Sequence, residues 1–384
     1  MSNQVLSYGM VGGGIGSFIG DVHRKAAAFD GKAKLVAGCF SRDFANTQQT
    51  GADLSIEPDR LYQSYAEMAE AEGARADGID FVSIVTPNNT HYPVAKAFLE
   101  HNINVVCDKP LTFTPAEAAE LADLAQAKGL LFCVTYTYSG YPMVKQAREM
   151  VRQGCIGEVR TVVAEYPQGW LATPVEKSGA NRQAAWRTDP LQSGRSNCVG
   201  DIGSHIENTV AYITGLKIKS LCAKLDIFGE GRSLDDNASI LVQYDTGATG
   251  VYWASQVAIG HDNGLKVRIY GTKGSIEWEQ ENPNYLRVAL IDQPALIYTR
   301  GGGYLYPAAA ELNRIPAGHP EGYYEAFANI YTAFSKALLK KKAGLELTAK
   351  DLDFPDAVAG LAGVIFINKC VDSSNAGSVW VDLD

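Results

Sequence analysis

Several features are missing from this sequence of 384 residues, and each absence excludes a class of protein. There is no excess of basic residues: 34 lysines and arginines face 43 aspartates and glutamates, which argues against nucleic acid as a partner. The seven cysteines contain no C-x-x-C pair, and several lie in apolar runs. We therefore expect reduced cysteines, without a disulfide framework and without a bound metal.

Targeting and membrane signals are also missing. The opening residues, MSNQVLSYGMVGGG, show neither the basic segment nor the apolar core of a secretory signal. We find no apolar run long enough to span a bilayer, and therefore expect a cytoplasmic protein with no membrane partner. The composition, with 46% hydrophobic and 20% charged residues, is ordinary for a globular protein, and the length predicts two domains.

The most informative stretch is YGMVGGGIGSFIGDVH, residues 8–23. An apolar strand ends there in glycines, and the chain turns directly into a predicted helix that runs toward Gly31. Glycine permits positive φ and close approach of a ligand, and the helix start presents N–H groups to phosphate. This pattern favours a pyrophosphate site, although Ser17 stands where the third glycine of G-x-G-x-x-G is expected. A glycine-rich turn without a ligand is the alternative.

The first third of the chain alternates apolar strands with helical patterns. Four further strands are predicted at residues 34–40, 81–85, 103–107 and 130–136. Continuous apolar strands separated by helices predict a parallel sheet covered on both faces, whose ligands bind at the carboxyl ends of the strands. Polar residues follow three of these ends, namely Ser41, Arg42, Thr86, Pro87, Asn88, Asp108 and Lys109. Thr90 is expected to cap a helix, and Thr114-Pro115 to begin another.

The pattern changes after about residue 141. Strand-like segments now alternate apolar and polar residues and are joined by short turns, which predicts an antiparallel or mixed sheet. We expect a free face of this sheet to pack against a second copy of the chain. The predicted division is a dinucleotide-binding domain, 1–140, and a domain for substrate binding and oligomerisation, 141–384. Residues 298–320 are predicted to form a long loop, and residues 322–339 a helix.

Two groups of residues in the second half of the chain are candidate catalytic or binding residues. Asp201 and His205 lie in a predicted helix, 201–213, and their spacing of four places them on one face. A carboxylate beside an imidazole fixes its tautomer and suits a general base; a helix-start aspartate and a core histidine are the alternative. Trp186 and Arg187 lie in a polar segment. We expect them either to line a sugar-sized pocket or to hold a loop in place. His91, His101 and His261 are expected at the surface or at helix caps.

These segments resemble the Gfo/Idh/MocA family of oxidoreductases. The resemblance rests on GMVGGGIGSFIGDVHRKAA, VTPNNTHYPVAKAFLEHNINVVCDKPL, WRTDPLQSG and GDIGSHIEN, and covers nearly the whole chain. It implies a Rossmann domain followed by a mixed-sheet domain that packs in dimers or tetramers. It also implies oxidation or reduction of a sugar or cyclitol with a nicotinamide cofactor. Lys109 matches the family's lysine, and Asp201 and His205 match its aspartate and histidine, although the triplet is DKP where EKP is commoner.

The candidate contacts follow from these arguments. The cofactor set is Gly12, Gly13, Gly14, Ile15, Ser41, Arg42, Thr86, Pro87, Asn88, His91, Asp108, Lys109, Trp186 and Arg187. The substrate set is Lys109, Tyr136, Tyr138, Gln168, Trp186, Asp201, His205 and His319. Ser41 and Arg42 stand where an acidic residue would hold the ribose of NAD. Because arginine accepts a 2′-phosphate, we expect NAD or NADP, with NADP favoured.

Two enzymatic functions remain open. The favoured one is an NAD(P)-dependent sugar or polyol dehydrogenase; the alternative is glycoside cleavage through a keto-sugar without net redox. The intact set of Lys109, Asp201 and His205 argues against a non-enzymatic regulator that binds the cofactor. In the predicted mechanism His205 is the base and Asp201 orients it. Lys109 then stabilises the alkoxide or relays the proton, and the roles of Lys109 and His205 are interchangeable.

Overall fold

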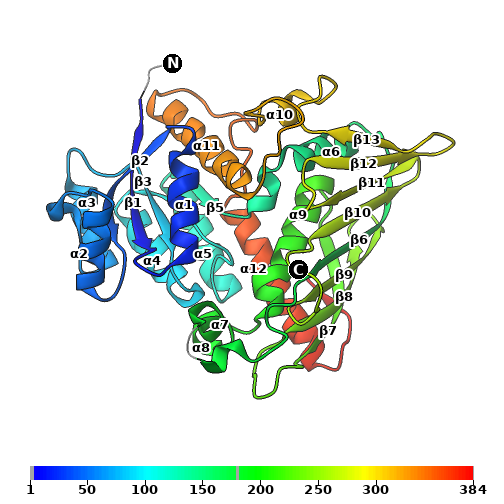
Figure 1. Ribbon diagram of the computed structural model, residues 1–384, viewed down its shortest axis with the longest axis horizontal. Helices are drawn as coiled ribbons and strands as arrows, with labels where there is room; N and C mark the ends of the chain where they lie inside the picture. Colours follow the sequence, from blue (N-terminus) through cyan, green and yellow to red (C-terminus); the bar gives the residue numbers. More distant parts are fainter. Residues whose placement is uncertain (1–3, 179–180, 384) are drawn as a thin grey trace. The chain divides into compact units, whose positions relative to one another are not determined.

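The computed structural model describes residues 4–178 and 181–383, which form two compact units (Figure 1). Unit 1 comprises Met1–Thr137 and Tyr323–Leu361, and unit 2 comprises Tyr138–Gly322 and Ala362–Asp384. This grouping differs from the predicted division in residues 138–140, which were assigned to the first domain, and in residues 323–361, which were assigned to the second. The latter segment packs with unit 1 because the apolar face of its helix is buried there, as described below.

Unit 1 contains a parallel sheet of five strands in the order β2-β1-β3-β4-β5, as the alternation of strands and helices predicts. The strands are β1 Leu6–Gly12, β2 Ala33–Cys39, β3 Phe81–Val85, β4 Asn104–Cys107 and β5 Phe132–Val134. The chain leaves β1 toward β2 and then returns to the other side of β1 as β3, so the strand order reverses between β1 and β3. Ligands of open parallel sheets bind at such a reversal, beyond the carboxyl ends of the strands.

Helices connect these strands in chain order. They are α1 Phe18–Phe29, α2 Phe44–Asp53, α3 Tyr65–Ala74, α4 His91–Glu100 and α5 Pro115–Ala127, with short 3₁₀ segments at Pro58–Arg60 and Asn88–Thr90. The predicted start of α5 is confirmed, since Thr114 and Glu117 form a reciprocal capping box. Thr90 does not cap α4 with its side chain, because its hydroxyl donates to the carbonyl of Pro87 at 2.9 Å.

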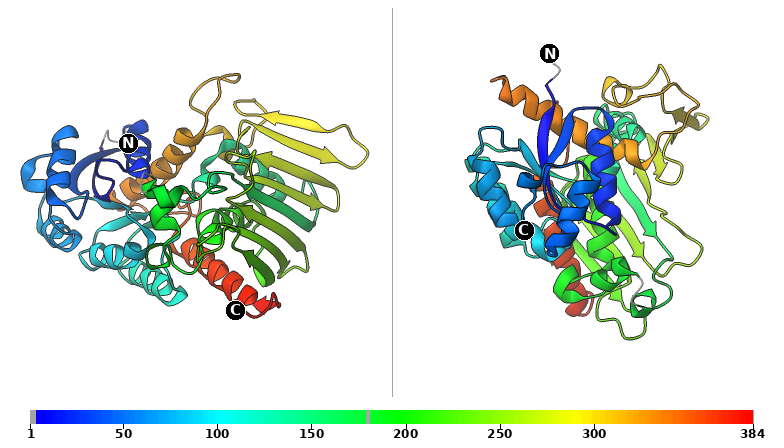
Figure 2. Two further views of the ribbon diagram at one scale, coloured as in Figure 1. Left: turned by 60° about the horizontal axis from the view of Figure 1, so that its bottom comes forward. Right: turned by 60° about the vertical axis from the view of Figure 1, so that its left-hand side comes forward.

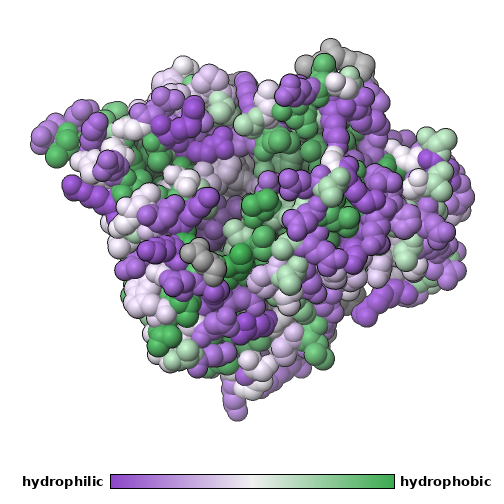
Figure 3. Space-filling model, turned by 180° about the vertical axis from the view of Figure 1, so that it is seen from behind, coloured by the Kyte–Doolittle hydropathy of each residue, from purple (hydrophilic) through white to green (hydrophobic). Residues whose placement is uncertain are grey.

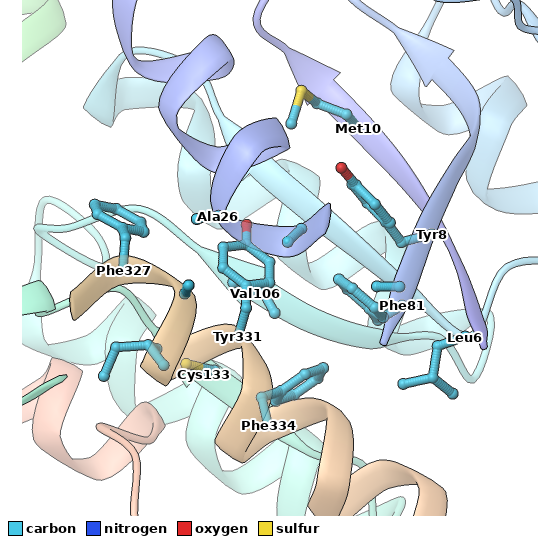
Figure 4. Packing of buried hydrophobic residues seen from close by; sticks show 14 of the residues in the cluster. Leu6, Tyr8, Met10, Ala26, Phe81, Val106, Cys133, Phe327, Tyr331 and Phe334 are labelled. Carbon is cyan, nitrogen blue, oxygen red and sulfur yellow. The ribbon is translucent and has the colours of Figure 1, made fainter. Parts of the chain in front are cut away.

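The helix α11, Tyr323–Lys342, completes the core of unit 1 (Figure 4). Its side chains Phe327, Tyr331 and Phe334 are buried and recur at helical spacing. The ring of Phe334 meets that of Phe81 on β3 edge to face, with centroids 5.2 Å apart, and Phe81 stacks on Tyr8 of β1 at 5.1 Å. These aromatic contacts assign α11 to the parallel sheet.

Unit 2 contains a sheet of nine strands in the order β13-β12-β11-β10-β6-β9-β8-β7-β14. Figure 2 shows this sheet from two further sides. The strands are β6 Val159–Pro167, β7 Ile218–Asp226, β8 Asn237–Tyr244, β9 Thr249–Ser255, β10 Lys266–Gly271, β11 Gly274–Glu279, β12 Tyr285–Leu290, β13 Leu296–Thr299 and β14 Val381–Asp382. The pairing of β6 with β9 is parallel and the other pairings are antiparallel, so the predicted mixed sheet is confirmed. The structure adds β12, β13 and β14, which were not predicted from the sequence.

The helical segments of unit 2 are α6 Pro142–Arg152, α7 Arg182–Arg187, α8 Pro190–Ser193, a π-helical turn Val199–Gly203, α9 Ser204–Thr214 and α10 Pro307–Ala310. Of these, α7, α8 and α10 were not predicted from the sequence. The predicted loop at 298–320 therefore contains the short helix α10. The buried Arg300 ties this loop together, because its guanidinium donates to the carbonyl of Ile315 and to the carboxylate of Glu321.

The helix α12, Ala357–Asn375, runs from unit 1 into unit 2. By length and composition alone it could cross a membrane, contrary to the expectation from the sequence. Half of its most apolar window is buried inside the structure, and its Val364, Phe366 and Cys370 are core residues. The core helix of a soluble protein can be equally long and apolar, so length and composition do not identify a membrane span.

Hydrophilic side chains cover much of the face shown in Figure 3, with apolar areas scattered among them.

Candidate active site

The glycine loop of unit 1 has the conformation that its sequence predicts. It joins Gly12, the last residue of β1, to Phe18, the first of α1. Gly12, Gly13 and Gly16 have φ values of +85°, +79° and +85°, a region that side chains disfavour. A Cβ atom on Gly20 would lie 2.4 Å from the Cα of Gly13, so Gly20 permits the close packing of α1 on the loop.

This geometry shows which residue takes the place of the third glycine of the G-x-G-x-x-G motif, where the sequence has Ser17. Gly20, in the first turn of α1, has that role, and the loop is longer than the standard fingerprint. Ser17 is instead the N-cap of α1, because its hydroxyl accepts from the amide of Gly20 at 3.3 Å. The amides of Gly14 and Ile15 donate within the protein, to the carbonyl of Phe40 at 3.1 Å and to Asn46 Oδ1 at 3.2 Å. They fix the loop against Phe40, which follows β2, and against the first turn of α2.

The loop fits the pyrophosphate of a dinucleotide. The amino end of α1, with its dipole, faces the chain segment that leaves β1 in positive φ. Beside Gly12, the buried hydroxyl of Thr86 has no hydrogen-bond partner within the described ranges 4–178 and 181–383. Gly12, Gly13 and Thr86 are therefore the groups that would hold the cofactor at the reversal of strand order.

The turn after β2 positions the residues that bear on cofactor choice. The hydroxyl of Thr47 accepts from the amide of Ser41 and donates to its carbonyl, at 3.0 and 3.2 Å. The carboxylate of Asp43 caps α2 by accepting from the amide of Ala45. Arg42 is exposed at this position. With Asp43 engaged as a cap, Arg42 is the charged side chain presented at the end of β2.

His91 is buried, so the expectation that it lies at the surface is wrong, whereas its expected place at a helix cap is confirmed: it is the C-cap residue of the segment Asn88–Thr90 and the first residue of α4. Its Nδ1 lies 2.8 Å from the carbonyl oxygen of Pro110, and its Nε2 lies 2.9 Å from that of Thr86. Burial lowers the pKa of this imidazole below its usual value. The ring thus links the turns after β3 and β4. His101 and His261 are exposed, as expected, and the predicted contact Asn88 is buried.

The turn after β4 carries Lys109. One carboxylate oxygen of Asp108, Oδ1, accepts from the backbone amide of Lys109 at 2.8 Å and from the hydroxyl of Thr135 at 3.1 Å. Lys109 is half-buried, and a cis peptide bond joins it to the buried Pro110. The position of Lys109 is therefore set by the carboxylate of its neighbour and differs from that of a fully exposed turn lysine. Tyr136, a predicted substrate contact, is buried in this unit.

In unit 2, Asp201 and His205 lie on two different kinds of helix. Asp201 belongs to the π-helical turn Val199–Gly203 and His205 to α9, where a single regular helix was predicted. The wider π turn changes the angle between residues four apart, and such turns are frequent at functional sites. The Oδ2 atom of Asp201 accepts from Arg187 Nε and from Gln256 Nε2, both at 3.0 Å. Its carboxylate is therefore oriented by partners that the sequence did not indicate.

The ring of His205 is nearly buried and lies among tyrosines. The ring of Tyr138 meets it edge to face with centroids 4.7 Å apart, and the ring of Tyr166 lies 6.2 Å away. The two tyrosine hydroxyls hydrogen-bond to each other, and that of Tyr166 also donates to Asn263 Oδ1 at 2.6 Å. Burial raises the pKa of Tyr138 above its ordinary value. These contacts fix the plane of the His205 ring.

Amide side chains extend this cluster. Gln168 Nε2 donates to Asn263 Oδ1 at 2.8 Å, and Trp170 Nε1 donates to Gln168 Oε1 at 2.9 Å. Tyr138 and Gln168 were predicted, whereas Tyr166, Trp170 and Asn263 were missed. The aromatic and amide residues of YPQGW, residues 166–170 at the end of β6, were the signal that could have pointed to Trp170. For Asn263, which lies between two strands, no signal was available.

The segment of Trp186 and Arg187 forms α7. The guanidinium of Arg187 lies 4.3 Å from the centroid of the Trp186 ring and donates to Gln183 Oε1 at 2.6 Å as well as to Asp201. Of the two interpretations, the structure shows an anchor, because Arg187 ties α7 to the π-helical turn. His319 is exposed in the loop that Arg300 organises.

The fold and the glycine loop define an oxidoreductase with an NAD-binding Rossmann domain. Residues 6–136 match the family described as "Oxidoreductase family, NAD-binding Rossmann fold", and residues 144–277 match "GFO/IDH/MocA C-terminal domain". The chain belongs to the Gfo/Idh/MocA family, and the resemblance seen in the sequence is confirmed.

Particular relatives agree with this placement. The uncharacterized oxidoreductase YfiI of Bacillus subtilis (strain 168) is 40% identical over 384 residues, which cover 99% of this chain and 97% of that protein. An inositol dehydrogenase homolog of Azotobacter vinelandii, solved with NAD+, is 39% identical with a TM-score of 0.94, and the match covers all of both chains. Its structure with NADH and myo-inositol matches at 39% identity and a TM-score of 0.90, over 99% of this chain and 98% of that one.

Proposed function

We propose that this protein is an NAD(P)-dependent dehydrogenase that oxidises or reduces one secondary hydroxyl of a neutral ring polyol, namely a sugar, a glycoside or a cyclitol. The observation that carries the proposal is the cluster around His205, which combines a carboxylate, amides and phenols with aromatic rings. Such groups donate and accept hydrogen bonds and suit a ring bearing several hydroxyls. Arg187, the cation of this cluster, is already paired with Asp201, so within the cluster it is not available as the partner of an anionic substrate.

The proposed catalytic residues are Lys109, Asp201 and His205. Oxidation of a secondary alcohol requires a proton to leave oxygen as a hydride leaves carbon, and the nicotinamide accepts the hydride when the cofactor is bound. We assign the proton to His205, because its ring is fixed by Tyr138 and an imidazole is the side chain suited to act as a base near neutral pH. Asp201, held by Arg187 and Gln256, supplies the negative charge that favours the imidazolium. Lys109 stabilises the alkoxide or relays the proton, and the two roles can be exchanged.

Support for this substrate class comes from a relative. The Azotobacter protein was solved with myo-inositol, a cyclitol, and is 39% identical over nearly the whole chain. For the cofactor, the same relative contains NAD+ or NADH, whereas the exposed Arg42 favours acceptance of a 2′-phosphate. We propose that both dinucleotides bind and that Arg42 contributes selectively to NADP.

The test is a panel of cyclitols, free sugars and glycosides, incubated with NAD+ or NADP+ and followed by the absorbance of the reduced cofactor. The expected result is stoichiometric reduction with at least one neutral ring polyol, absent in a His205→Ala variant. Cleavage of a glycoside without accumulation of reduced cofactor would instead support the alternative function. Activity confined to anionic substrates would contradict the proposal.

We also propose that the protein assembles as a homodimer or homotetramer through the free face of the nine-stranded sheet. Leu241 on β8 and Val251 on β9 are directly opposite each other in the register and about half exposed, at 47% and 46%. Light scattering at micromolar concentration should show an assembly, and a Leu241→Glu/Val251→Glu variant should be monomeric. A monomeric native protein would contradict this.

A further inference from the structure

His23 is a buried, titratable side chain of unit 1 to which the proposed mechanism assigns no role. It lies on α1, one turn after Gly20, where the helix packs on the glycine loop, and it is fully inaccessible to solvent. Phe327 and Tyr331 of α11 contact its ring edge to face, with centroid distances of 4.8 and 5.8 Å. A hydrocarbon side chain would fill this position at lower cost, because an imidazole in an apolar core loses its hydration. The polar contacts of the ring therefore need an explanation.

One nitrogen of the ring is engaged by hydroxyl groups. Nδ1 lies 2.7 Å from the hydroxyl of Tyr331 and 3.4 Å from that of Ser83 on β3, and these two hydroxyls are 2.8 Å apart. A neutral imidazole carries one proton, so the partners of one nitrogen decide the state of the other. If Ser83 donates to Tyr331 and Tyr331 donates to Nδ1, all three groups are satisfied and the proton is on Nε2.

The other nitrogen is directed at the turn that carries Lys109. Nε2 lies 3.8 Å from Asp108 Oδ2 and has no hydrogen-bond partner within residues 4–178 and 181–383. The proton on Nε2 is the favourable arrangement, because a nitrogen lone pair facing a carboxylate would be repelled. The second oxygen of Asp108, Oδ1, accepts from the amide of Lys109 and from Thr135. An attraction that fixes Oδ2 therefore also fixes the oxygen that holds Lys109.

We propose that His23 is a positioning residue: the Nε2 tautomer, set by Ser83 and Tyr331, orients the carboxylate of Asp108 and thereby the backbone of Lys109. The inference rests on the proposed function where it concerns turnover, since it assumes that Lys109 takes part in proton transfer. The sequence separation of 308 residues between His23 and Tyr331 explains why no local pattern indicates the arrangement.

Two substitutions separate the two sides of the ring. In His23→Gln, the amide nitrogen can occupy the position of Nε2 and donate toward Asp108, but the contact with Tyr331 is lost. In His23→Asn, the amide oxygen can accept from Tyr331 in place of Nδ1, but no donor reaches Asp108. We expect His23→Asn to lower kcat about 10–100-fold, with KM for the cofactor changed less than about twofold, and His23→Gln to retain kcat within about fivefold. His101→Asn, at an exposed histidine, is the control and should match the native enzyme.

A measurement without turnover tests the same inference. In the native protein labelled with 15N-histidine and 15N-lysine, NMR should show the Nε2–H tautomer for His23. The amide resonance of Lys109, which reports its hydrogen bond to Asp108, should shift in His23→Asn and stay near its native position in His23→Gln. A native Nδ1–H tautomer, an unchanged Lys109 amide in His23→Asn, or equal kcat losses in both variants would overturn the proposal. A native enzyme inactive on every polyol would refute the proposed function and leave this NMR test standing.

Discussion

The two units hold their candidate site residues in different ways. In unit 1 the residues follow strand ends and are fixed by nearby backbone: Asp108 accepts from the next residue in the chain, and Ser17 caps the helix that begins beside it. In unit 2 the site is a network of side chains from separate segments. Asp201 accepts from Gln256, 55 residues away, and Gln168 donates to Asn263, 95 residues away. Local geometry therefore makes both the residues and the contacts of the first set recognisable in sequence. In the second set Asp201 and His205 are recognisable as candidates, but their side-chain partners meet only when the sheet has formed.

The largest expected effect tests whether both units contribute to the chemistry. Lys109→Ala in unit 1 and His205→Ala in unit 2 should each lower kcat by about 10²–10⁴-fold, the usual range for general acid–base groups, with little change in cofactor affinity. The pH profile of kcat/KM should lose its acidic limb in His205→Ala. Near-normal turnover in either variant would remove that residue from the mechanism and restrict the chemistry to one unit.

The second prediction tests the assignment of α11 to unit 1. Phe334 is fully buried against Phe81, so Phe334→Ala should destabilise unit 1 by about 3–5 kcal/mol through lost burial and a cavity. Hydrogen exchange should accelerate in β1 and β3 more than in β8. Leu345→Ala, at a 54% exposed position of the same segment, is the matched control and should change stability by less than about 0.5 kcal/mol. Equal acceleration in both sheets would contradict a separate unit 1.

The third prediction is that the units respond to pH in opposite directions. Burial lowers the pKa of His23 to about 4, opposed by Asp108 and assisted by Arg24 and His91. The unfolded state then binds more protons between pH 4 and 6.5, so unit 1 loses stability as pH falls through that window, by up to about 3 kcal/mol. Burial raises the pKa of Glu207 on α9 to about 8, so the folded state keeps its proton and unit 2 loses stability as pH rises from about 4.5 to 8.

Hydrogen exchange of β3 and β8 amides, corrected for intrinsic rates and measured across this pH range, would separate the two responses. His23→Asn should flatten the acid response of β3, and Glu207→Gln should flatten the response of β8 at higher pH. Since His91 is also buried and its pKa is also lowered, some acid response should persist in His23→Asn. If the stability of both units changed with pH in the same direction, the prediction would be wrong.

The smallest expected effect concerns a single surface residue of unit 1. Arg42→Ala should lower kcat/KM for NADP about tenfold and that for NAD less than about twofold, because one charged contact with the 2′-phosphate is lost. Arg42→Lys should recover part of the loss, since it keeps the charge without the planar fork. Equal losses for the two cofactors would show that Arg42 acts on the shape of the turn.

The sequence by itself determined the parallel sheet, the mixed sheet and the glycine loop. Each is encoded within a few neighbouring residues, by apolar runs, alternation or glycines that permit positive φ. Lys109, Asp201 and His205 were selected as candidates in the same way, by their place in short motifs. The fold class and the family could be predicted from these motifs, because each motif is defined by residue types at fixed spacing, which can be read directly in the sequence.

Only the tertiary structure decided how these residues are held. Burial of the aromatic face of α11 grouped residues 323–361 with the first sheet, because a helix packs where its apolar stripe finds a partner. In the folded chain Asp201, in the π-helical turn, accepts hydrogen bonds from Arg187 and Gln256. The buried His91 links the turns after β3 and β4, and the buried His23 contacts Tyr331, 308 residues away on α11. Burial and long-range hydrogen bonds depend on which surfaces meet. That information lies in the packing of the whole chain, and no local pattern of residues contains it.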